Sequence, residues 1–312
     1  MHTPADALES PRFTGPRTFA RLPLVADLEG VDCAVYGIPW DGSASFRAGS
    51  RFGPEAIRAA SVLLRPYNAE QRTAVFGSLS VIDHGDAPTV PGYVEDTFER
   101  VAAFAGRIAQ AGVVPLALGG DHSVTLPQLR ALAAVHGPLG LVQLDAHSDL
   151  WDSFFGRPYS HGTVFRRAID EGLVDPARCF QAGMRGTLYG PADVQQGHEL
   201  GTEVARWAEI APLAPAAFAD RVRARVGTGP TFLTFDIDFF DPAFAPATGT
   251  PECGGPTSHH GLGLVRALTG IDFVGFDVVE VAPQYDGPGQ VTSLLAATVA
   301  YELLTLLALR AV

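Results

Sequence analysis

The sequence predicts an α/β protein in which a mainly parallel sheet is covered by helices on both faces, a three-layer α/β/α arrangement. Two observations support this prediction. Short apolar runs recur along the chain, and they are nearly continuous rather than alternating, as is typical of parallel strands buried on both faces. Helical patterns stand between these runs, and regular alternation of strand and helix indicates a parallel sheet.

The individual elements follow from these patterns in chain order. Strands are expected at 33–39, 78–83, 113–120, 139–146, 179–184, 231–238 and 273–281. Apolar residues at helical spacing predict helices at 54–64, 94–111 and 124–136. The segment 186–230 shows no clear period and is expected to contain helix with loops.

The 312-residue chain is expected to form one domain over 1–312, with 1–30 as an N-terminal extension, because no Pro/Ser-rich linker divides it. The apolar stretch 291–309 is long enough to prompt the question of a membrane span. Glu302 and several Thr and Ser residues interrupt it. A packed core helix is therefore the preferred interpretation, and no membrane partner is expected.

The formal net charge of −12 argues against nucleic acid as a partner, because nucleic-acid sites are basic, and it suits a small cationic substrate. Cys33, Cys179 and Cys253 are far apart and form no CxxC pair. This pattern predicts a reduced, cytoplasmic protein without disulfides or structural zinc. The N-terminal stretch carries acids and lacks an apolar core, so no signal peptide is expected.

Polar side chains follow four of the predicted strands at the point where each strand ends. Ligands of parallel sheets bind beyond the carboxyl ends of the strands, and uncompensated carboxylates there would be costly. We therefore expect these ends to meet in one site. The residues are Asp121 and His122 after 113–120, Asp145, His147 and Asp149 after the apolar run LGLVQL, Asp236, Asp238 and Asp241 after TFLTF, and Glu280 after FVGFDVV.

Each motif alone has a purely structural explanation: GGDH at 119–122 as a glycine turn, DAHSD at 145–149 as a solvated loop, and DID at 236–238 as a helix N-cap. Together they favour a metal site. Two imidazoles and four carboxylates are too many for one octahedral ion but fit two ions that share bridging carboxylates. A mixed Asp/His set without thiolate favours Mn²⁺.

At this point the residues resemble a known family. GGDHS at 119–123, DAHSD at 145–149 and TFDIDFFDPAFAPATGTPECGG at 234–255 are similar to the three signatures of the ureohydrolases, the family of arginase, agmatinase and related amidinohydrolases. The similarity continues through 46–58, 160–168 and 277–286, and so covers nearly the whole chain. It implies an arginase-like fold, two Mn²⁺ per subunit, hydrolysis of a guanidino group to urea and an amine, and a homo-oligomer, trimer or hexamer.

The resemblance also implies roles for single residues. One Mn²⁺ would be bound by His122, Asp145, Asp149 and Asp236, and the other by Asp145, His147, Asp236 and Asp238. Glu280 would pair with the planar guanidinium in a bidentate way, and Asp149 would orient the attacking water. His161, in SHGT, would shuttle a proton to the leaving amine.

The substrate depends on the segments around this core. The form HGTVFRRA at 161–168 is closer to agmatinases and bacterial guanidino-acid hydrolases than to arginases. Agmatine, cleaved to putrescine and urea, is slightly preferred, with Trp151 and Asp152 as candidates to bind its ammonium. The alternative is 4-guanidinobutyrate, 3-guanidinopropionate or a larger guanidino natural product; the candidates to bind a carboxylate are Arg47, Arg157, Arg185 and Tyr189.

Two alternative hypotheses for the function remain. A metal-dependent deacetylase-like enzyme would share the fold but use one ion, and a non-catalytic subunit would lack activity. The intact ligand set argues against both. His84 has no assigned role, and His259-His260 is expected to be a polar surface pair.

Overall fold

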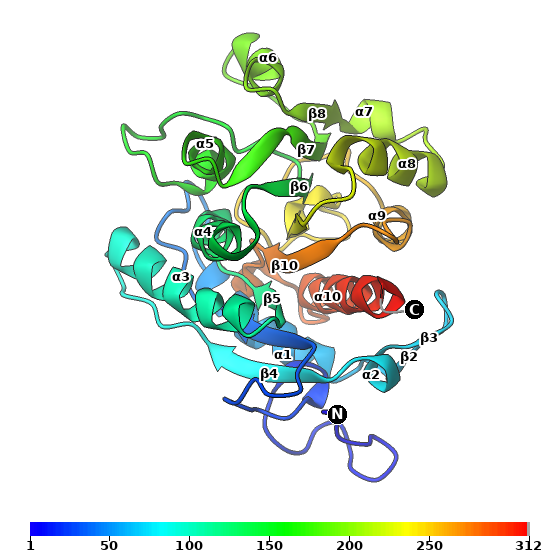
Figure 1. Cartoon of the computed structure of the whole chain (residues 1–312). Helices are drawn as coiled ribbons and strands as arrows, with labels where there is room; N and C mark the ends of the chain where they lie inside the picture. The colour runs from blue at the N-terminus through cyan, green and yellow to red at the C-terminus, as the bar shows by residue number, and fades with distance from the viewer. Residues whose placement is uncertain (311–312) are drawn as a thin grey trace.

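The computed structural model describes residues 1–310, and its centre is one sheet of eight strands that are all parallel (Figure 1). The strand order is β4-β1-β5-β10-β9-β6-β7-β8. The parallel sheet predicted from the apolar runs is therefore confirmed. The strands are β1 (Cys33–Gly37), β4 (Val81–Asp86), β5 (Val114–Leu118), β6 (Leu139–Leu144), β7 (Val174–Met184), β8 (Glu203–Arg206), β9 (Thr231–Asp236) and β10 (Phe273–Val279).

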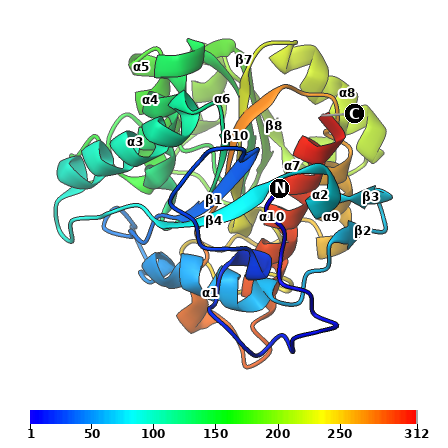
Figure 2. The same cartoon turned by 60° about the horizontal axis from the view of Figure 1, so that its bottom comes forward.

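Helices cover both faces of this sheet, as Figures 1 and 2 show from two directions. One layer contains α3 (Val94–Gln110), α4 (Thr125–His136) and α5 (Val164–Asp170). The opposite layer contains α1 (Gly53–Ser61), α8 (Pro215–Val226), α9 (Ser258–Arg266) and α10 (Val291–Arg310). Shorter helices are α2 (Val75–Ser78), α6 (Ala192–Glu199) and α7 (Trp207–Ile210), with 3-10 turns at Phe19–Arg21, Ser50–Phe52, His122–Val124, His161–Thr163, Ile237–Phe239 and Pro283–Tyr285.

Strand β6 illustrates why the predicted runs had to be continuously apolar. All six of its residues are buried. Alternate side chains point to opposite faces: Val142 and Leu144 join the core under α8 and α10, whereas Leu139 and Leu141 join the core under α4 and α5. The strand therefore feeds two hydrophobic cores at once.

Three strands lie outside the sequence prediction. Strand β8 lies within 186–230, and a two-stranded antiparallel pair, β2 (Tyr67–Asn68) and β3 (Thr73–Ala74), lies apart from the main sheet. Strand β8 is at the sheet edge, and only one of its four residues is fully buried. It therefore lacks the continuous apolar run that identifies the inner strands.

Helix α10 is long and apolar enough to cross a membrane, but 83% of its most apolar window is buried inside the protein. Its one acid in that stretch, Glu302, is only 2% exposed and receives two hydrogen bonds from the Arg266 guanidinium, at 2.9 and 2.7 Å. These contacts support the interpretation of α10 as a core helix.

The N-terminal extension and the unassigned histidines have packing roles. The buried Phe19 donates its backbone N–H to Asp83 Oδ2 at 2.8 Å, which ties the extension to β4. His84 Nδ1 lies 2.8 Å from the carbonyl oxygen of Val25. His260 packs edge-on against Trp207, with ring centroids 5.1 Å apart.

Candidate metal centre

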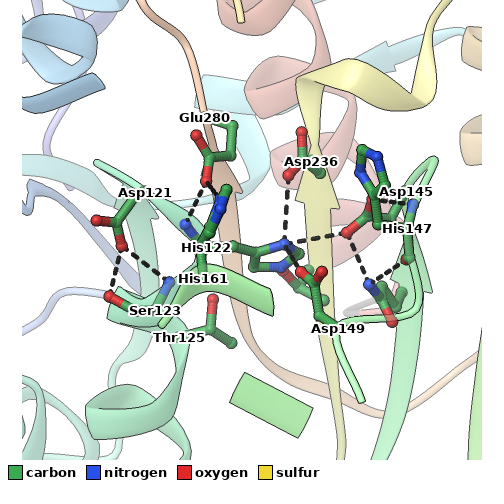
Figure 3. A network of polar contacts seen from close by, with 12 residues as sticks. Asp121, His122, Ser123, Thr125, Asp145, His147, Asp149, His161, Asp236 and Glu280 are labelled. Carbon is green, nitrogen blue, oxygen red and sulfur yellow. Dashed lines mark hydrogen bonds and ion pairs between the residues drawn. The ribbon is translucent and has the colours of Figure 1, made fainter. Parts of the chain in front are cut away.

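Most of the polar residues predicted to converge do so at the carboxyl ends of β5, β10, β9 and β6, four neighbouring strands in the middle of the sheet. Asp241 does not: its carboxylate accepts backbone N–H groups of Ala243, Gly254 and Gly255 and organises the loop after β9. His122 follows β5, Glu280 follows β10, Asp236 ends β9, and Asp145 follows β6. Figure 3 shows His122 beside Asp145, Asp149 and Asp236, with Glu280 and His161 on its other side. Strand order alone thus brings together motifs up to 158 residues apart.

The first group of candidate ligands surrounds His122. Its Nδ1 lies 3.0 Å from Oδ2 of Asp145, 3.0 Å from Oδ2 of Asp149 and 3.3 Å from Oδ2 of Asp236. The ligand atoms of His122, Asp145 and Asp149 all lie within 4.8 Å of one another. This spacing suits one shared divalent cation.

The second group surrounds His147. Its Nδ1 lies 3.1 Å from Asp238 Oδ2 and 3.6 Å from Asp145 Oδ1. The ligand atoms of Asp145, His147 and Asp238 also lie within 4.8 Å of one another. Asp145 belongs to both groups, one oxygen toward each, as a bridging carboxylate requires. All six predicted metal ligands are therefore close together.

The unpartnered atoms of this cluster test whether metal ions fit it. His122 Nδ1 and Asp238 Oδ2 are buried and have no hydrogen-bond partner among residues 1–310. Buried polar atoms are rarely left unpaired, because doing so costs about 1–3 kcal/mol each. Both atoms face oppositely charged neighbours in ligand-like geometry. The donor set, imidazole nitrogen with carboxylate oxygen, suits Mn²⁺ or a similar divalent ion.

The directions of the pKa shifts indicate that negative charge is crowded in the cluster. Burial and the charge of Asp145 raise the pKa of Asp149 to about 6. Burial, together with neighbouring carboxylates, also raises the pKa values of Asp236 and Asp238. The pKa of His122 lies well above its usual value, because its carboxylate partners outweigh the effect of burial. Divalent cations would relieve this excess of negative charge.

Polar residues inside otherwise apolar strands orient the ligands. Thr234 Oγ1 lies 2.8 Å from His122 Nε2, which leaves Nδ1 directed at the carboxylates. Gln143 Nε2 donates to Asp145 Oδ2 at 2.7 Å and to the His147 carbonyl at 3.0 Å. Such outer contacts fix ligand orientation in metal sites. Sequence reasoning missed both residues, although a buried Gln in LGLVQL and a Thr in TFLTF were visible signals.

Backbone geometry is also unusual at the site. Asp149 and Glu280 adopt φ values of +53° and +65°, a region that non-glycine residues seldom occupy. Such strain persists where surrounding structure holds it and clusters at functional sites. Gly120, before His122, has no room for a side chain, since a Cβ there would lie 1.6 Å from the Trp40 carbonyl oxygen. This close approach explains the second glycine of GGDHS.

Glu280 lies behind the ligands and has one occupied and one free oxygen. Its Oε1 accepts a hydrogen bond from the His122 backbone N–H at 2.9 Å and lies 2.9 Å from His161 Nδ1. Its Oε2 is buried without a partner among residues 1–310. Gly249 leaves space beside it, since a Cβ there would lie 3.0 Å from Oε2. Only one oxygen of Glu280 thus lacks a partner among residues 1–310, fewer than a bidentate contact needs.

His161 is held in the protonated form. Burial disfavours the charged imidazole, but the hydrogen bond and charge of Glu280 outweigh burial and raise the pKa of His161 to about 9. His161 therefore carries a proton at neutral pH, and Glu280 Oε1 links it to the backbone N–H of the candidate ligand His122. It is placed to donate that proton to a group in the cavity.

A cavity of about 740 Å³ opens onto the ligands. His147, Asp149, Asp236 and His161 line its inner part. Aromatic residues form much of its wall: Trp151 stacks on Phe154 with centroids 5.0 Å apart, and Tyr189 packs against Trp151 at 5.4 Å. Cavities of this size hold small organic ligands.

Only some of the residues predicted to bind substrate line the cavity. The walls that residues 1–310 form around this cavity include Trp151 and Tyr189, but not Asp152, Arg157 or Arg47. Asp152 pairs instead with Arg167, at 2.5 Å, and is 69% exposed. The Arg47 guanidinium lies over the ring of Tyr285, 5.0 Å from its centroid.

Arg185 lines the cavity, but its guanidinium is already committed. Its Nη2 donates to the carbonyl oxygens of Asp238 at 2.7 Å and Glu252 at 2.9 Å. Burial lowers the pKa of this guanidinium. Arg185 therefore holds the loop beyond β9 and has few donors left for a substrate carboxylate.

Comparisons with known proteins agree with these observations. The model of the Arginase family matches residues 31–305. A guanidinopropionase of Pseudomonas aeruginosa is 48% identical over 98% of this chain and 96% of its own length. A mitochondrial agmatinase of Gallus gallus is 43% identical over 98% of this chain and 90% of its own length. The structure of proclavaminate amidino hydrolase from Streptomyces clavuligerus superimposes with a TM-score of 0.92 at 41% identity, covering 96% of this chain and all of that one.

The resemblance inferred from the three motifs is thereby confirmed, as is the arginase-like fold. The matched region includes every strand of the main sheet and all six candidate ligands. The chain belongs to the arginase family.

Proposed function

We propose that this chain, a metal-dependent ureohydrolase, uses two Mn²⁺ ions to hydrolyse a linear guanidino compound to urea and an amine. One observation carries the proposal: the two imidazole–carboxylate groups that share Asp145 lie beside a buried, unpartnered oxygen of Glu280. The first feature suits a pair of cations, and the second suits a positively charged donor such as guanidinium.

Glu280 would orient the substrate. A guanidinium carbon is a poor electrophile because its charge is delocalised, so its plane must be fixed relative to the attacking water. Oε1 of Glu280 is held by His122 and His161, which leaves Oε2 to accept an N–H of the guanidinium. The missing side chain of Gly249 leaves the space for that group.

Bound divalent ions would supply the nucleophile by lowering the pKa of water. The remaining chemistry is proton transfer. Hydrolysis consumes one water and delivers both of its protons to the leaving nitrogen, so a side chain must carry protons across the site. His161 is protonated at neutral pH and lines the cavity, which suits it to donate to the amine as the carbon–nitrogen bond breaks.

For the group at the far end of the substrate we propose a carboxylate, so that the substrate is a short guanidino acid. The relative with 48% identity is named guanidinopropionase. Arg206 lines the cavity and forms no ion pair within residues 1–310, so it is available to a carboxylate. This order reverses the sequence-based preference for agmatine, because Asp152, the expected partner of its ammonium, faces away from the cavity and pairs with Arg167.

Agmatine remains the second candidate, because the cavity also contains an acid. Glu252 lines the wall and forms no ion pair within residues 1–310. It could accept an ammonium at the far end of the substrate. An agmatinase is among the relatives, at 43% identity.

The test is urea release by the manganese-loaded protein from guanidinopropionate, guanidinobutyrate, agmatine and arginine, with bound metal counted per chain. Arg206→Ala should lower kcat/KM for the guanidino acids alone, and Glu252→Ala should lower it for agmatine alone. If the protein releases urea from none of these compounds and from no member of a wider guanidino panel, the enzyme proposal is wrong. One zinc ion per chain would instead favour the deacetylase-like reading.

A further inference from the structure

Both ring nitrogens of His161 are engaged, and the second partner is a residue to which the sequence motifs assign no role. Nδ1 lies 2.9 Å from Glu280 Oε1. Nε2 lies 2.6 Å from Ser45 Oγ and accepts the Ser45 backbone N–H at 3.2 Å. Ser45 also lines the cavity. Its hydroxyl therefore lies beside the imidazole on the wall of the space in which a substrate would bind.

The segment that carries Ser45 is bonded to the site before Ser45 and closed on itself after Ser45. Ser43, two residues earlier, donates its backbone N–H to Asp121 Oδ2 at 2.8 Å, and its carbonyl accepts from the His161 N–H at 3.3 Å. Beyond Ser45, the Gly49 N–H donates to Asp41 Oδ2 at 2.6 Å. The Ser43 bonds hold the loop against the His161 turn, so the loop backbone fixes the position of Ser45 relative to His161.

The chemistry of the two partners explains why a hydroxyl suits this position. Glu280 accepts at Nδ1, so the neutral imidazole has its lone pair at Nε2 and can accept the Ser45 hydroxyl proton. In the protonated ring, Nε2 carries a hydrogen and no longer accepts the Ser45 backbone N–H. It donates instead to Ser45 Oγ, and the hydroxyl hydrogen can then turn toward the cavity. A hydroxyl serves both protonation states, whereas a methyl group serves neither.

We infer that Ser45 holds the His161 ring through Nε2 and relays the proton of that ring to the leaving nitrogen. In this step the Nε2–H bond breaks, a new O–H bond forms at Ser45, and the original hydroxyl proton moves to the amine. Ser45 ends unchanged, and His161 becomes neutral. The inference rests on the proposed ureohydrolase reaction.

Three variants of the manganese-loaded full chain test this role. Ser45→Ala should lower kcat about 10- to 100-fold, part of the range that acid–base catalysis supplies, with KM and bound metal within about twofold of wild type. Ser45→Thr keeps a hydroxyl and should restore most of kcat. Ser43→Ala is the matched control: it lies in the same loop, keeps its backbone bonds, and its hydroxyl makes no hydrogen bond within residues 1–310.

A double-mutant cycle identifies the residue through which Ser45 acts. In a His161→Ala background, Ser45→Ala should change kcat by less than about twofold, because a group that works through His161 has nothing left to position. Wild-type kcat in Ser45→Ala would overturn the inference. So would a full additional loss in the double variant, which would mean that Ser45 acts independently of His161.

Failure of the inference can be separated from failure of the proposed function. If the wild-type protein releases no urea from any guanidino compound, the function is wrong. The Ser45 contact is then still tested by ¹⁵N NMR of labelled histidine. Ser45→Ala should shift the Nε2 resonance of His161 and leave Nδ1 nearly unchanged, and an unshifted Nε2 resonance would overturn the contact itself.

Discussion

Two clusters of buried charge in this protein differ in how they are neutralised. The cluster around Glu302, between α10 and α9, is complete within the chain: Oε1 accepts two N–H groups of Arg266, and Oε2 accepts from Asn68 at 2.9 Å and Gln71 at 3.1 Å. The cluster at the carboxyl ends of β5, β6 and β9 has four carboxylates and two imidazoles, and two of its buried polar atoms have no hydrogen-bond partner within residues 1–310.

The difference separates a structural ion pair from a binding site. Buried charge is tolerated when geometry and hydrogen bonds compensate for the lost water, and Arg58 shows the same closure as Glu302, with Nε and Nη2 on Asp83 at 2.8 and 2.9 Å. A buried cluster that remains acidic and incompletely hydrogen-bonded must be completed from outside the chain. Burial of charged groups alone therefore does not indicate a functional site. Buried charges that the chain leaves uncompensated, with polar atoms that lack hydrogen-bond partners, do indicate one.

The strongest test of this difference is to remove one candidate ligand from the cluster at the carboxyl ends of β5, β6 and β9. Asp236→Ala should abolish stable metal binding and lower kcat/KM at least about 10⁴-fold, since the bound ions supply several kcal/mol of catalysis. Metal per chain, measured by atomic emission, and urea release test this. Asp241→Ala is a control on the same loop, because Asp241 Oδ2 bonds backbone N–H groups of Gly254 and Gly255. Two tightly bound ions in Asp236→Ala would refute the ligand assignment.

Removing the proton donor should leave the cluster intact. His161→Ala is expected to keep both ions and lower kcat about 10²- to 10³-fold, because His161 contacts Glu280 rather than the metal ligands that surround His122. Steady-state kinetics at saturating manganese measure the change. Full activity in this variant would exclude His161 from proton transfer.

Removing a charge from the cluster around Glu302 should lower stability and leave metal binding unchanged. Glu302→Ala strands the Arg266 guanidinium and should lower the free energy of unfolding by about 3 kcal/mol, within the range found when one partner of a buried pair is lost. Replacing Glu302 and Arg266 together by leucine should cost less than the single change. Urea unfolding measures both, and bound manganese per chain should stay at the wild-type value. Loss of metal in Glu302→Ala would contradict the separation of the two clusters.

Metal affinity should depend on pH in a defined direction. Neighbouring carboxylates outweigh burial and raise the pKa values of His122 and His147 well above 6.5, so both rings bind protons at neutral pH when no ion competes. Manganese must displace these protons, and its affinity should rise about tenfold per pH unit for each proton displaced. Calorimetry in buffers of different ionisation enthalpy counts the protons released. An affinity independent of pH between 6 and 8, taken as roughly the working range of histidine, would mean that the rings bind no metal.

The inner sheet and the ligands could be predicted from the sequence for the same physical reason. Strands buried on both faces must be continuously apolar, so Asp145 or Asp236 at the end of such a run stands out as an exception that needs a partner. Edge strand β8 is not buried on both faces, so it does not need a continuous apolar run and could not be predicted from the sequence. The supporting residues Ser45, Gln143 and Thr234 were also missed, because single hydroxyls and amides carry no pattern until the fold places them beside the histidines and carboxylates that they contact.

The outer wall of the cavity was the hardest part to predict, and Asp152 shows why. It directly follows the cavity-lining Trp151, but a side chain on a loop can turn to either side, and here it pairs with Arg167 at the surface. Exposed pairs contribute only about 0–1 kcal/mol, so Asp152→Asn should change stability by less than about 1 kcal/mol. It should also leave KM for agmatine within about twofold, whereas Glu252→Ala should raise it. A large rise in KM for agmatine in Asp152→Asn would place this side chain in the substrate site after all and restore the sequence-based preference for agmatine.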